Sequence, residues 1–316
     1  MILQTQIPLK KQPHYQIDYD SKLFLVGSCF SENIGQKLSY YKFQTQQNPL
    51  GILFHPKAIE NLIEKAINET TFNETSIFEL NERWHSFEAH STISTANKIL
   101  LLENLNNAIQ LTTQQITNAT HIIITLGTAW VYRHIASDTI VANCHKVPQK
   151  QFLKELLSVD EIAECLDSIC SLIKAVNPKA SILFTVSPVR HIKDGFVENQ
   201  RSKSHLLAGI HQIIEPRKQR FYFPSYEIMM DELRDYRFYK EDMIHPNTIA
   251  IQYIWEKFQE TWFSNSAYNT LKEVEEIQRG LAHKPFNPSS EAHQKFLNKL
   301  IDKKEKLENK FPFIKF

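Results

Sequence analysis

Three polar residues of this 316-residue chain have the types and the spacing that nucleophilic catalysis requires. Ser28 follows a short apolar run and precedes a plausible helix over residues 31–40, so we expect its hydroxyl to be exposed at the carboxyl edge of a sheet, near helix N–H groups that stabilise an oxyanion. Asp242 precedes His245 by three residues, and its carboxylate can bond one imidazole nitrogen while the other acts as a base. These residues form a candidate Ser-His-Asp triad.

The same residue types also have structural interpretations, and one neighbour competes for the role of nucleophile. A serine between a strand and a helix commonly caps the helix. Cys29 is the competing nucleophile, because a thiol at a helix N-terminus has a lowered pKa, although we favour a role as a small buried apolar residue. His55, His85 and His90 lack a carboxylate or thiol at metal-ligand spacing, so we expect no metal site.

Short continuous apolar runs predict the strands that position these residues, because strands covered on both faces have this pattern. A weaker candidate strand covers residues 41–46. Apolar residues at steps of three and four predict the helices between the strands, with Pro246 at the first position of the last one. The predicted strands are 23–27, 121–127, 182–188 and 221–226, and the predicted helices are 56–67, 160–175, 200–214 and 246–263.

This alternation predicts a three-layer α/β/α domain with a parallel sheet over residues 1–264, whose ligand lies beyond the carboxyl ends of the strands. Residues 265–316 have no strand signal, a Pro-Asn-Pro break and a highly charged helix. They predict a C-terminal helical hairpin packed on the main domain, with a partner-binding arm as the alternative. The apolar residues available for this packing are Phe296, Leu297, Leu300, Ile301 and Leu307.

The composition excludes several classes of site. The chain has only 7 glycines, and no two lie closer than eight positions, whereas phosphate loops, dinucleotide turns and the GxSxG elbow need glycines about two to five positions apart. We therefore expect no nucleotide cofactor. A net charge of +1 gives no general attraction to nucleic acid or to a membrane surface. Four cysteines without CxxC spacing, and an N-terminus without an export signal, predict a soluble cytoplasmic protein whose oligomeric state is unknown.

Five sequence blocks, in order, closely resemble those of the GSCFA family, which is similar to the SGNH (GDSL-like) hydrolases and acyltransferases. The resemblance covers about residues 22–262, and the stretch HKPFNPSS is also similar to family sequence. It implies an SGNH-like domain with a flavodoxin-like parallel sheet. The blocks are FLVGSCFSENIG, NPLGILFHP, VANCHKVP, SPVRHIKDGFVENQRSK and DMIHPN.

The resemblance also implies roles for single residues. Ser28 matches the nucleophile, Asp242 and His245 match the paired residues of the last block, and Gly51 matches the glycine whose N–H binds the oxyanion together with the N–H of Ser28. The sequence departs from the pattern at 127–130, where Gly-Thr-Ala-Trp replaces GxND. The asparagine that normally completes the oxyanion hole is therefore missing there.

Four further residues are assigned to the oxyanion hole or to substrate binding. Gly127 ends the third predicted strand at the position of the missing asparagine, and Asn143 could supply the amide instead. His145 could bind substrate or serve as a satisfied structural histidine. Lys203 follows the strand at 182–188 and could neutralise an anionic substrate group.

These expectations define a serine-dependent acyl-ester hydrolase, of esterase or deacetylase type, that acts through an acyl-Ser28 intermediate. An O-acyltransferase with the same triad is an alternative, because it differs only in whether water or a bound hydroxyl receives the acyl group. A non-catalytic ligand-binding module of the same fold is the second alternative, and the missing asparagine favours it. The expected substrate is a small-molecule or glycan acyl ester.

Overall fold

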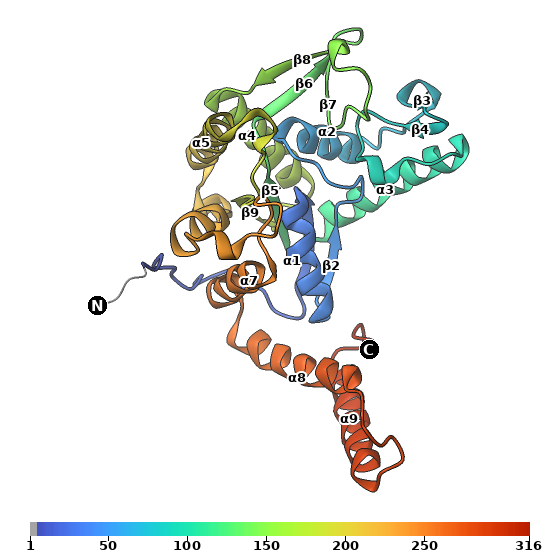
Figure 1. Ribbon diagram of the computed structural model, residues 1–316, viewed down its shortest axis with the longest axis vertical. Helices are drawn as coiled ribbons and strands as arrows, with labels where there is room; N and C mark the ends of the chain where they lie inside the picture. The colour runs from blue at the N-terminus through green and yellow to red at the C-terminus, as the bar shows by residue number, and fades with distance from the viewer. Residues whose placement is uncertain (1–4) are drawn as a thin grey trace.

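The computed structural model describes residues 5–316 and has a five-stranded parallel sheet at its centre (Figure 1). The predicted α/β class and the parallel sheet are confirmed. The first four residues of the N-terminal segment, where we expected no export signal, lie outside the described residues. The sheet contains β1 (Lys22–Gly27), β2 (Gln44–Gln47), β5 (His121–Leu126), β9 (Ser181–Val186) and β10 (Arg220–Tyr222).

The order of the strands across the sheet is β10-β9-β5-β1-β2, which is the flavodoxin-like order of doubly wound sheets. In this order the chain changes direction across the sheet between β1 and β5. A crevice opens outside the carboxyl ends of two such strands, and ligands of this class of fold bind there. The segments that follow β1 and β5 are therefore the first place to look for a site.

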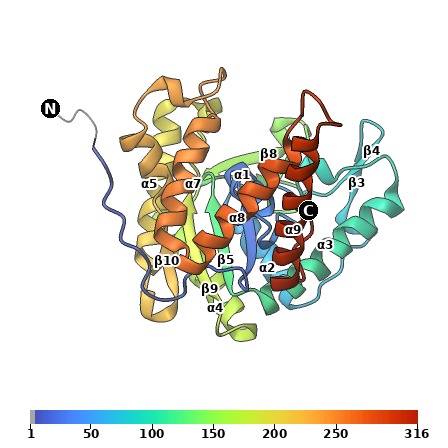
Figure 2. The ribbon, with the colours of Figure 1, turned by 90° about the horizontal axis from the view of Figure 1, so that it is seen from below.

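Helices cover both faces of the sheet, which accounts for the continuous apolar runs in its strands. Phe24 and Val26 of β1 belong to the core on one face, whereas Leu23 and Leu25 belong to the core on the other, because successive strand residues point to opposite sides. Figure 2 shows α7 on the near side of the sheet. One face is covered by α2 (Pro56–Ile67), α3 (Lys98–Asn118), α4 (Val159–Val176) and α5 (Phe196–Ile213), and the other by α1 (Cys29–Tyr40) and α7 (Thr248–Trp262). The short α6 (Ser225–Glu227) places Tyr226 in the first of these two cores.

The last core helix begins later than the sequence suggested. Asn247 caps α7, and its Oδ1 accepts the N–H groups of Ile249 and Ala250. Pro246 therefore precedes the cap instead of taking the first helical position, and the expectation for Pro246 was wrong. It forms an isolated bridge with Tyr239, which closes the loop that carries Asp242 and His245.

Two small sheets lie outside the central one and were not predicted. The strand β6 pairs with both of its neighbours in an antiparallel sheet of order β7-β6-β8. A hairpin, β3 with β4, lies earlier in the chain. Their bounds are β3 (Phe78–Leu80), β4 (Arg83–His85), β6 (Trp130–His134), β7 (Thr139–Val141) and β8 (Phe152–Leu156).

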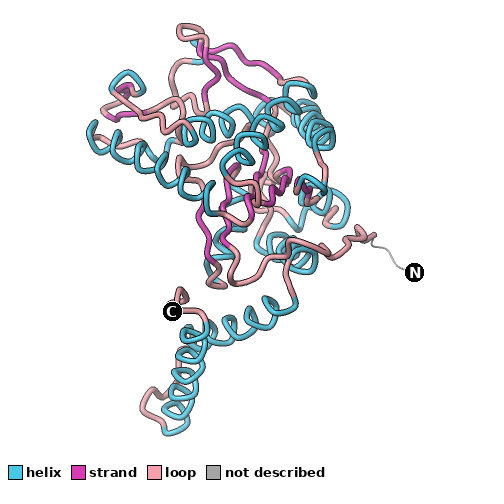
Figure 3. The backbone as a smooth tube through the Cα atoms, turned by 180° about the vertical axis from the view of Figure 1, so that it is seen from behind, coloured by secondary structure: helices cyan, strands magenta, loops and turns pink. Residues whose placement is uncertain are grey.

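The C-terminal segment forms two helices, α8 (Asn265–Ala282) and α9 (Glu291–Lys310), that project from the α/β body (Figures 1 and 3). A Cβ on Gly280 would lie 2.6 Å from Leu300 Cδ1, so the glycine allows the two helices to pack closely. Leu300 and Leu307 are buried as expected, but Phe296 is 37% and Ile301 51% exposed, so these two do not hold the helices to the body. None of the helices within residues 5–316 is both long and apolar enough to cross a bilayer.

Candidate functional site

The turn after β1 is built around a glycine that no other residue could replace without moving the sheet. Gly27 has a φ of +137°, and a Cβ there would lie 2.1 Å from Thr125 O of β5. The chain then passes directly into α1, with Ser28 as its N-cap. The Oγ of Ser28 accepts the Phe30 N–H at a donor–acceptor distance of 3.4 Å. Ser28 therefore has the expected place at the end of β1 and also has the expected capping role.

The Ser28 side chain is completely buried, so the expectation of an exposed hydroxyl was wrong. The cause is the close packing of the segments that follow β1, β5 and β9. The position that a Cβ on Gly127 would take lies 3.3 Å from Ser28 Cβ, 3.1 Å from His191 Nε2 and 3.1 Å from Phe54 O. Ser28 thus lies beside Gly127 at the switch point of the sheet, under the segments that carry Phe54 and His191.

The backbone N–H groups assigned to the oxyanion hole are bonded to other backbone atoms. The Ser28 N–H donates to Thr125 O at 3.0 Å, and the Gly51 N–H donates to Asn48 O at 2.8 Å within a turn where Gly51 has a φ of +74°. Either group could bind an oxyanion only after leaving its carbonyl. The Cys29 N–H, at the first position of α1, donates to no other residue in the described part of the chain, although its own thiol is within reach.

Asp242 and His245 form the hydrogen-bonded pair that their spacing predicted. Asp242 Oδ2 lies 2.7 Å from His245 Nδ1, and Asp242 Oδ1 accepts the N–H groups of Ile244 and His245, both at 2.9 Å. These N–H donors lower the pKa of Asp242 to about 2, so the carboxylate is charged at neutral pH. His245 Nε2 has no hydrogen-bond partner among residues 5–316 and is available as a base.

The loop of Asp242 and His245 is attached to the segment that follows β9. The Arg190 N–H donates to Ile244 O at 3.2 Å, and Arg190 Nη1 donates to Met243 O at 3.3 Å. The next residue, His191, is close enough to His245 for a charge there to lower the pKa of His191. His191 therefore neighbours both the Asp242–His245 pair and Ser28.

Lys203 is not exposed to a substrate pocket, so the expectation that it neutralises an anionic substrate group was wrong. It is fully buried, and its Nζ donates to Gly127 O at 2.6 Å and to Ser187 O at 2.7 Å. Burial lowers its pKa to about 7, and Cys29 acts in the opposite direction. Lys203 thus joins the segments that follow β5 and β9 and keeps them in register.

Two neighbours of Lys203 on the same face of α5 act in the same way. Asn199 Oδ1 accepts the N–H of His191 at 2.8 Å, and Ser202 Oγ accepts the N–H of Ala129 at 2.7 Å. The sequence contained a signal for this function, because polar residues at 199, 202 and 203 continue the apolar face of α5 at helical spacing. Of the three, only Lys203 was assigned to the site from the sequence, and the role of all three in holding these loops was not predicted.

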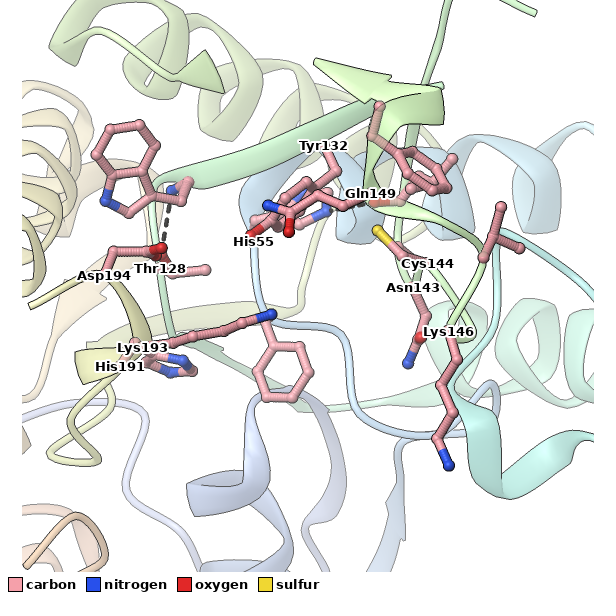
Figure 4. Close-up of a pocket in the computed structure, with 16 residues that line it drawn as sticks. His55, Thr128, Tyr132, Asn143, Cys144, Lys146, Gln149, His191, Lys193 and Asp194 are labelled. Carbon is pink, nitrogen blue, oxygen red and sulfur yellow. Dashed lines mark hydrogen bonds between the residues drawn. The ribbon is translucent and has the colours of Figure 1, made fainter. Parts of the chain in front are cut away.

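A cavity of about 430 Å³ opens beside His191, between the antiparallel sheet and the segment after β9 (Figure 4). Its walls are largely aromatic or aliphatic, whereas Lys193 extends into it from the His191 segment. Lys193 forms no ion pair within the described chain, while the neighbouring Asp194 is bonded to Lys154 at 2.6 Å. The apolar wall residues are Phe54, Trp130, Tyr132, Val141, Ala142, Val147 and Phe152.

The segment 143–145 is divided between the cavity and the core. Asn143 and Cys144 line the cavity, on the side opposite His191 (Figure 4). The Oδ1 of Asn143 accepts the His145 N–H at 2.9 Å, and the amide does not lie against Gly127, where the missing asparagine would be. His145 is buried behind the cavity wall, where its Nε2 donates to Ser86 O at 2.6 Å and burial lowers its pKa to about 4. The structural interpretation of His145 fits only in part, because its Nδ1 is buried and has no hydrogen-bond partner among residues 5–316.

The other histidines assigned to a conceivable metal site are bonded to protein groups. His55 caps α2 through Nδ1, which accepts the Ala58 N–H at 3.1 Å, and its Nε2 bonds Val141 O at 3.0 Å. His85 uses its two nitrogens on Ser94 and Leu80. Within residues 5–316, no group of three or more metal-ligating side chains is placed to hold a metal ion.

Cys29 is half-buried at the start of α1, and not fully buried as expected. Burial and the nearby Glu32 carboxylate raise the pKa of its thiol, although the Lys203 ammonium opposes them. The thiol is therefore protonated at neutral pH and a poor nucleophile. This favours Ser28 over Cys29 as the candidate nucleophile.

A parallel sheet covered by helices on both faces, with polar side chains gathered beyond the ends of β1, β5 and β9, defines an α/β protein with a switch-point site. The chain belongs to the GSCFA family, whose model matches residues 22–258. A second family model, described as "GSCFA domain protein, C-terminal domain", matches residues 274–316. A search of curated proteins gave no match.

Proposed function

We propose that this protein is an SGNH-type acyl-ester hydrolase or O-acyltransferase in which Ser28 is the nucleophile. The observation that carries the proposal is the Asp242–His245 pair, with a 2.7 Å hydrogen bond to Nδ1 and an Nε2 without a partner in residues 5–316. Its loop is bonded to the segment of His191, which lies beside Gly127 and Ser28. A carboxylate that orients an imidazole in this way is the arrangement that activates a serine hydroxyl.

In the proposed reaction Ser28 Oγ attacks the acyl carbonyl carbon while His245 Nε2 takes the hydroxyl proton, and the carbonyl oxygen becomes an oxyanion. His245 then gives the proton to the departing alcohol as the ester C–O bond breaks, which leaves acyl-Ser28. Water, or a bound acceptor hydroxyl, attacks the acyl carbonyl carbon while His245 Nε2 takes its proton. The bond between the acyl carbon and Ser28 Oγ then breaks, and His245 gives the proton to Oγ. The products are a carboxylic acid or a new ester, and free Ser28.

Because Ser28 is covered in this structure, the proposal requires the segment of Phe54 to move aside when substrate enters. The cavity beside His191 supplies the space for the rest of the substrate. Its apolar walls suit an acyl chain or the face of a sugar ring, and the unpaired ammonium of Lys193 suits an anionic group. We therefore propose a small-molecule or glycan acyl ester, with a carboxylate or phosphate elsewhere in the molecule, as the substrate.

Labelling with a fluorophosphonate probe, measured by the mass of the intact protein, tests the nucleophile. We expect the wild type to gain one phosphonyl group, Ser28→Ala to gain none, and Cys29→Ala to label like the wild type. If Cys29→Ala abolishes labelling and Ser28→Ala does not, the thiol is the nucleophile. A wild type that is never labelled contradicts the proposed chemistry.

A non-catalytic binding module is the second candidate function, and the buried Ser28 together with the bonded N–H groups of Ser28 and Gly51 favours it. Its experiment uses phosphate and short carboxylates as probes in a thermal-shift series. A binding module would be stabilised by such a probe equally in wild type and in Ser28→Ala, and neither protein would be labelled by the fluorophosphonate. Labelling of the wild type excludes this candidate.

A further inference from the structure

His191 has a polar atom that the fold leaves without a partner. Its Nε2 is buried and forms no hydrogen bond within the part of the chain that the structure describes. The backbone is fixed because Asn199 Oδ1 accepts the His191 backbone N–H at 2.8 Å, and the ring of Phe54 packs edge-on against the imidazole at 5.5 Å between centroids. The unpartnered atom is therefore held in a defined place, which is unusual because buried polar groups are nearly always paired.

That place lies beside Gly127. Nε2 lies 3.1 Å from the position that a Cβ on Gly127 would take, and Ser28 Cβ lies 3.3 Å from the same position. His191 Nε2 and Ser28 therefore meet where Gly127 lacks a side chain, and we call this place the gap beside Gly127. The fit is tight, so even the methyl group of an alanine would press on both neighbours.

The acceptors that surround the gap are already bonded. Phe54 O accepts the N–H groups of both Gly127, at 2.7 Å, and Thr128, at 3.0 Å, and Gly127 O accepts Lys203 Nζ. A carbonyl oxygen has two lone pairs, so Phe54 O has no capacity for a third donor. Gly127 O and Ser28 Oγ each accept one bond, but neither lies in hydrogen-bond geometry with His191 Nε2, so a proton on Nε2 has no acceptor among the described residues.

We propose that the gap beside Gly127 is an oxyanion-binding site in which the Nε2–H of His191 donates to the oxygen that becomes charged when Ser28 is acylated. His191 then takes the role of the asparagine that is missing from 127–130, and Asn143 does not. The site would also bind the oxygen of a phosphonate or boronate joined to Ser28. This inference rests on the proposed function and identifies the group that its chemistry lacked.

The charge state of the ring agrees with this role. Burial, with smaller contributions from the charges of Lys203 and His245, lowers the pKa of His191 to about 3, so the imidazole is neutral at working pH. A neutral imidazole can donate a hydrogen bond to a developing oxyanion without giving up its proton. Among residues 5–316 no carboxylate is bonded to the ring of His191 to orient it as a base, whereas His245 has Asp242.

The test compares two replacements of His191 by the rate of fluorophosphonate labelling and by kcat and KM for p-nitrophenyl acetate. His191→Leu keeps the volume without the donor and should lower both the labelling rate and kcat by about 10²–10³, with KM little changed. His191→Gln keeps an N–H near the position of Nε2 and should recover at least tenfold of that loss. Gly127→Ala fills the gap and should lower kcat in the same direction. His211→Leu, on the exposed end of α5, is the matched control.

The outcomes separate this inference from the proposed function. If the wild type is not labelled, both are overturned. If the wild type is labelled and His191→Leu reacts at the same rate, only the role of His191 is overturned. If His191→Gln is as slow as His191→Leu, a donor role is also overturned, and a base or a purely structural role takes its place. Proton NMR of the phosphonylated wild type should show a downfield Nε2–H signal that is lost in folded His191→Gln, and its absence would likewise contradict the inference.

Discussion

The two halves of the proposed site are built in opposite ways. Asp242 and His245 lie on an exposed loop and bond each other within three residues of chain, and His245 Nε2 faces no protein partner in residues 5–316. Ser28, Gly127 and His191 come from three distant segments and are packed so closely that the Ser28 side chain is fully buried. The base is assembled by local sequence, whereas the nucleophile and the oxyanion gap depend on the packing of the whole sheet edge.

This difference predicts whether a substitution changes activity alone or both activity and stability. Changes in the Asp242–His245 loop should alter chemistry and leave stability nearly unchanged, because the loop is exposed. Changes around Ser28 and Lys203 should alter both, because those groups are buried and bonded to the backbone.

The largest expected effect is on the exposed half. His245→Ala removes the base and should lower kcat for p-nitrophenyl acetate by about 10⁴ or more, with an unchanged unfolding midpoint in urea. His283→Ala, just beyond the C-terminal end of α8, is the control and should retain wild-type kinetics. A His245→Ala enzyme within tenfold of wild type would show that another group is the base.

Asp242→Asn should have the next largest effect, about 10³–10⁴ in kcat. The amide keeps an oxygen for the loop N–H groups but places a donor opposite His245 Nδ1, so the ring loses the tautomer that leaves Nε2 free to accept a proton. Because the pKa of Asp242 is lowered to about 2, the wild-type rate should show no titration of this carboxylate above about pH 4. A variant with full activity would show that the 2.7 Å bond has no part in catalysis.

Lys203→Met tests the buried half through stability. The variant leaves Gly127 O and Ser187 O without their donor and should lose about 2–4 kcal/mol of unfolding free energy at pH 9. The folded-state pKa of Lys203 is about 7, below its unfolded value, so the unfolded state binds more protons between these values and wild-type stability rises with pH there. The difference between the two proteins in urea titrations should therefore shrink at pH 6. If the difference in unfolding free energy between the two proteins is the same at pH 6 and pH 9, the lowered pKa of Lys203 is contradicted.

The smallest expected effect is a change in the pH dependence of stability on replacing His55, a buried histidine away from the gap. Burial lowers the pKa of His55 to about 4, so the unfolded state binds more protons between about pH 4 and 6.5, and stability falls as the pH falls through this window. His55→Asn keeps a good cap on α2 and removes this titration. Between pH 6 and 5 the variant should lose about 1 kcal/mol less than the wild type, whereas His211→Asn should not differ from it.

The central sheet was predictable because burial on both faces gives its strands an unmistakable composition. The run at 121–127 is apolar and β-branched, and the structure places β5 there. The edge strand β2 was only a weak candidate, since QTQQ has no apolar pattern and is paired on one side only. The Asp242–His245 bond was predictable for another reason, since it needs only local chain geometry.

Helix α3 was not predicted, although its sequence contains a helical signal. Buried residues such as Leu101, Leu105 and Ile116 recur at helical spacing.

The other unpredicted parts depend on packing between distant segments. The small antiparallel sheet mixes polar and apolar residues because one of its faces lines the cavity. Nothing in the order of residues shows that His191 reaches Gly127, because that contact arises only when β5 and β9 lie side by side.

The cap on α1 couples the first turn of that helix to the acylation state of Ser28 in the proposed cycle. Ser28 Oγ accepts the Phe30 N–H in the resting protein, and an ester oxygen is a poorer acceptor than a hydroxyl. Acylation would therefore weaken the first turn of α1 at the moment when the covalent intermediate forms, and deacylation would restore it. In the proposed cycle the first turn of α1 would thus be less stable in the acyl-enzyme than in the free enzyme.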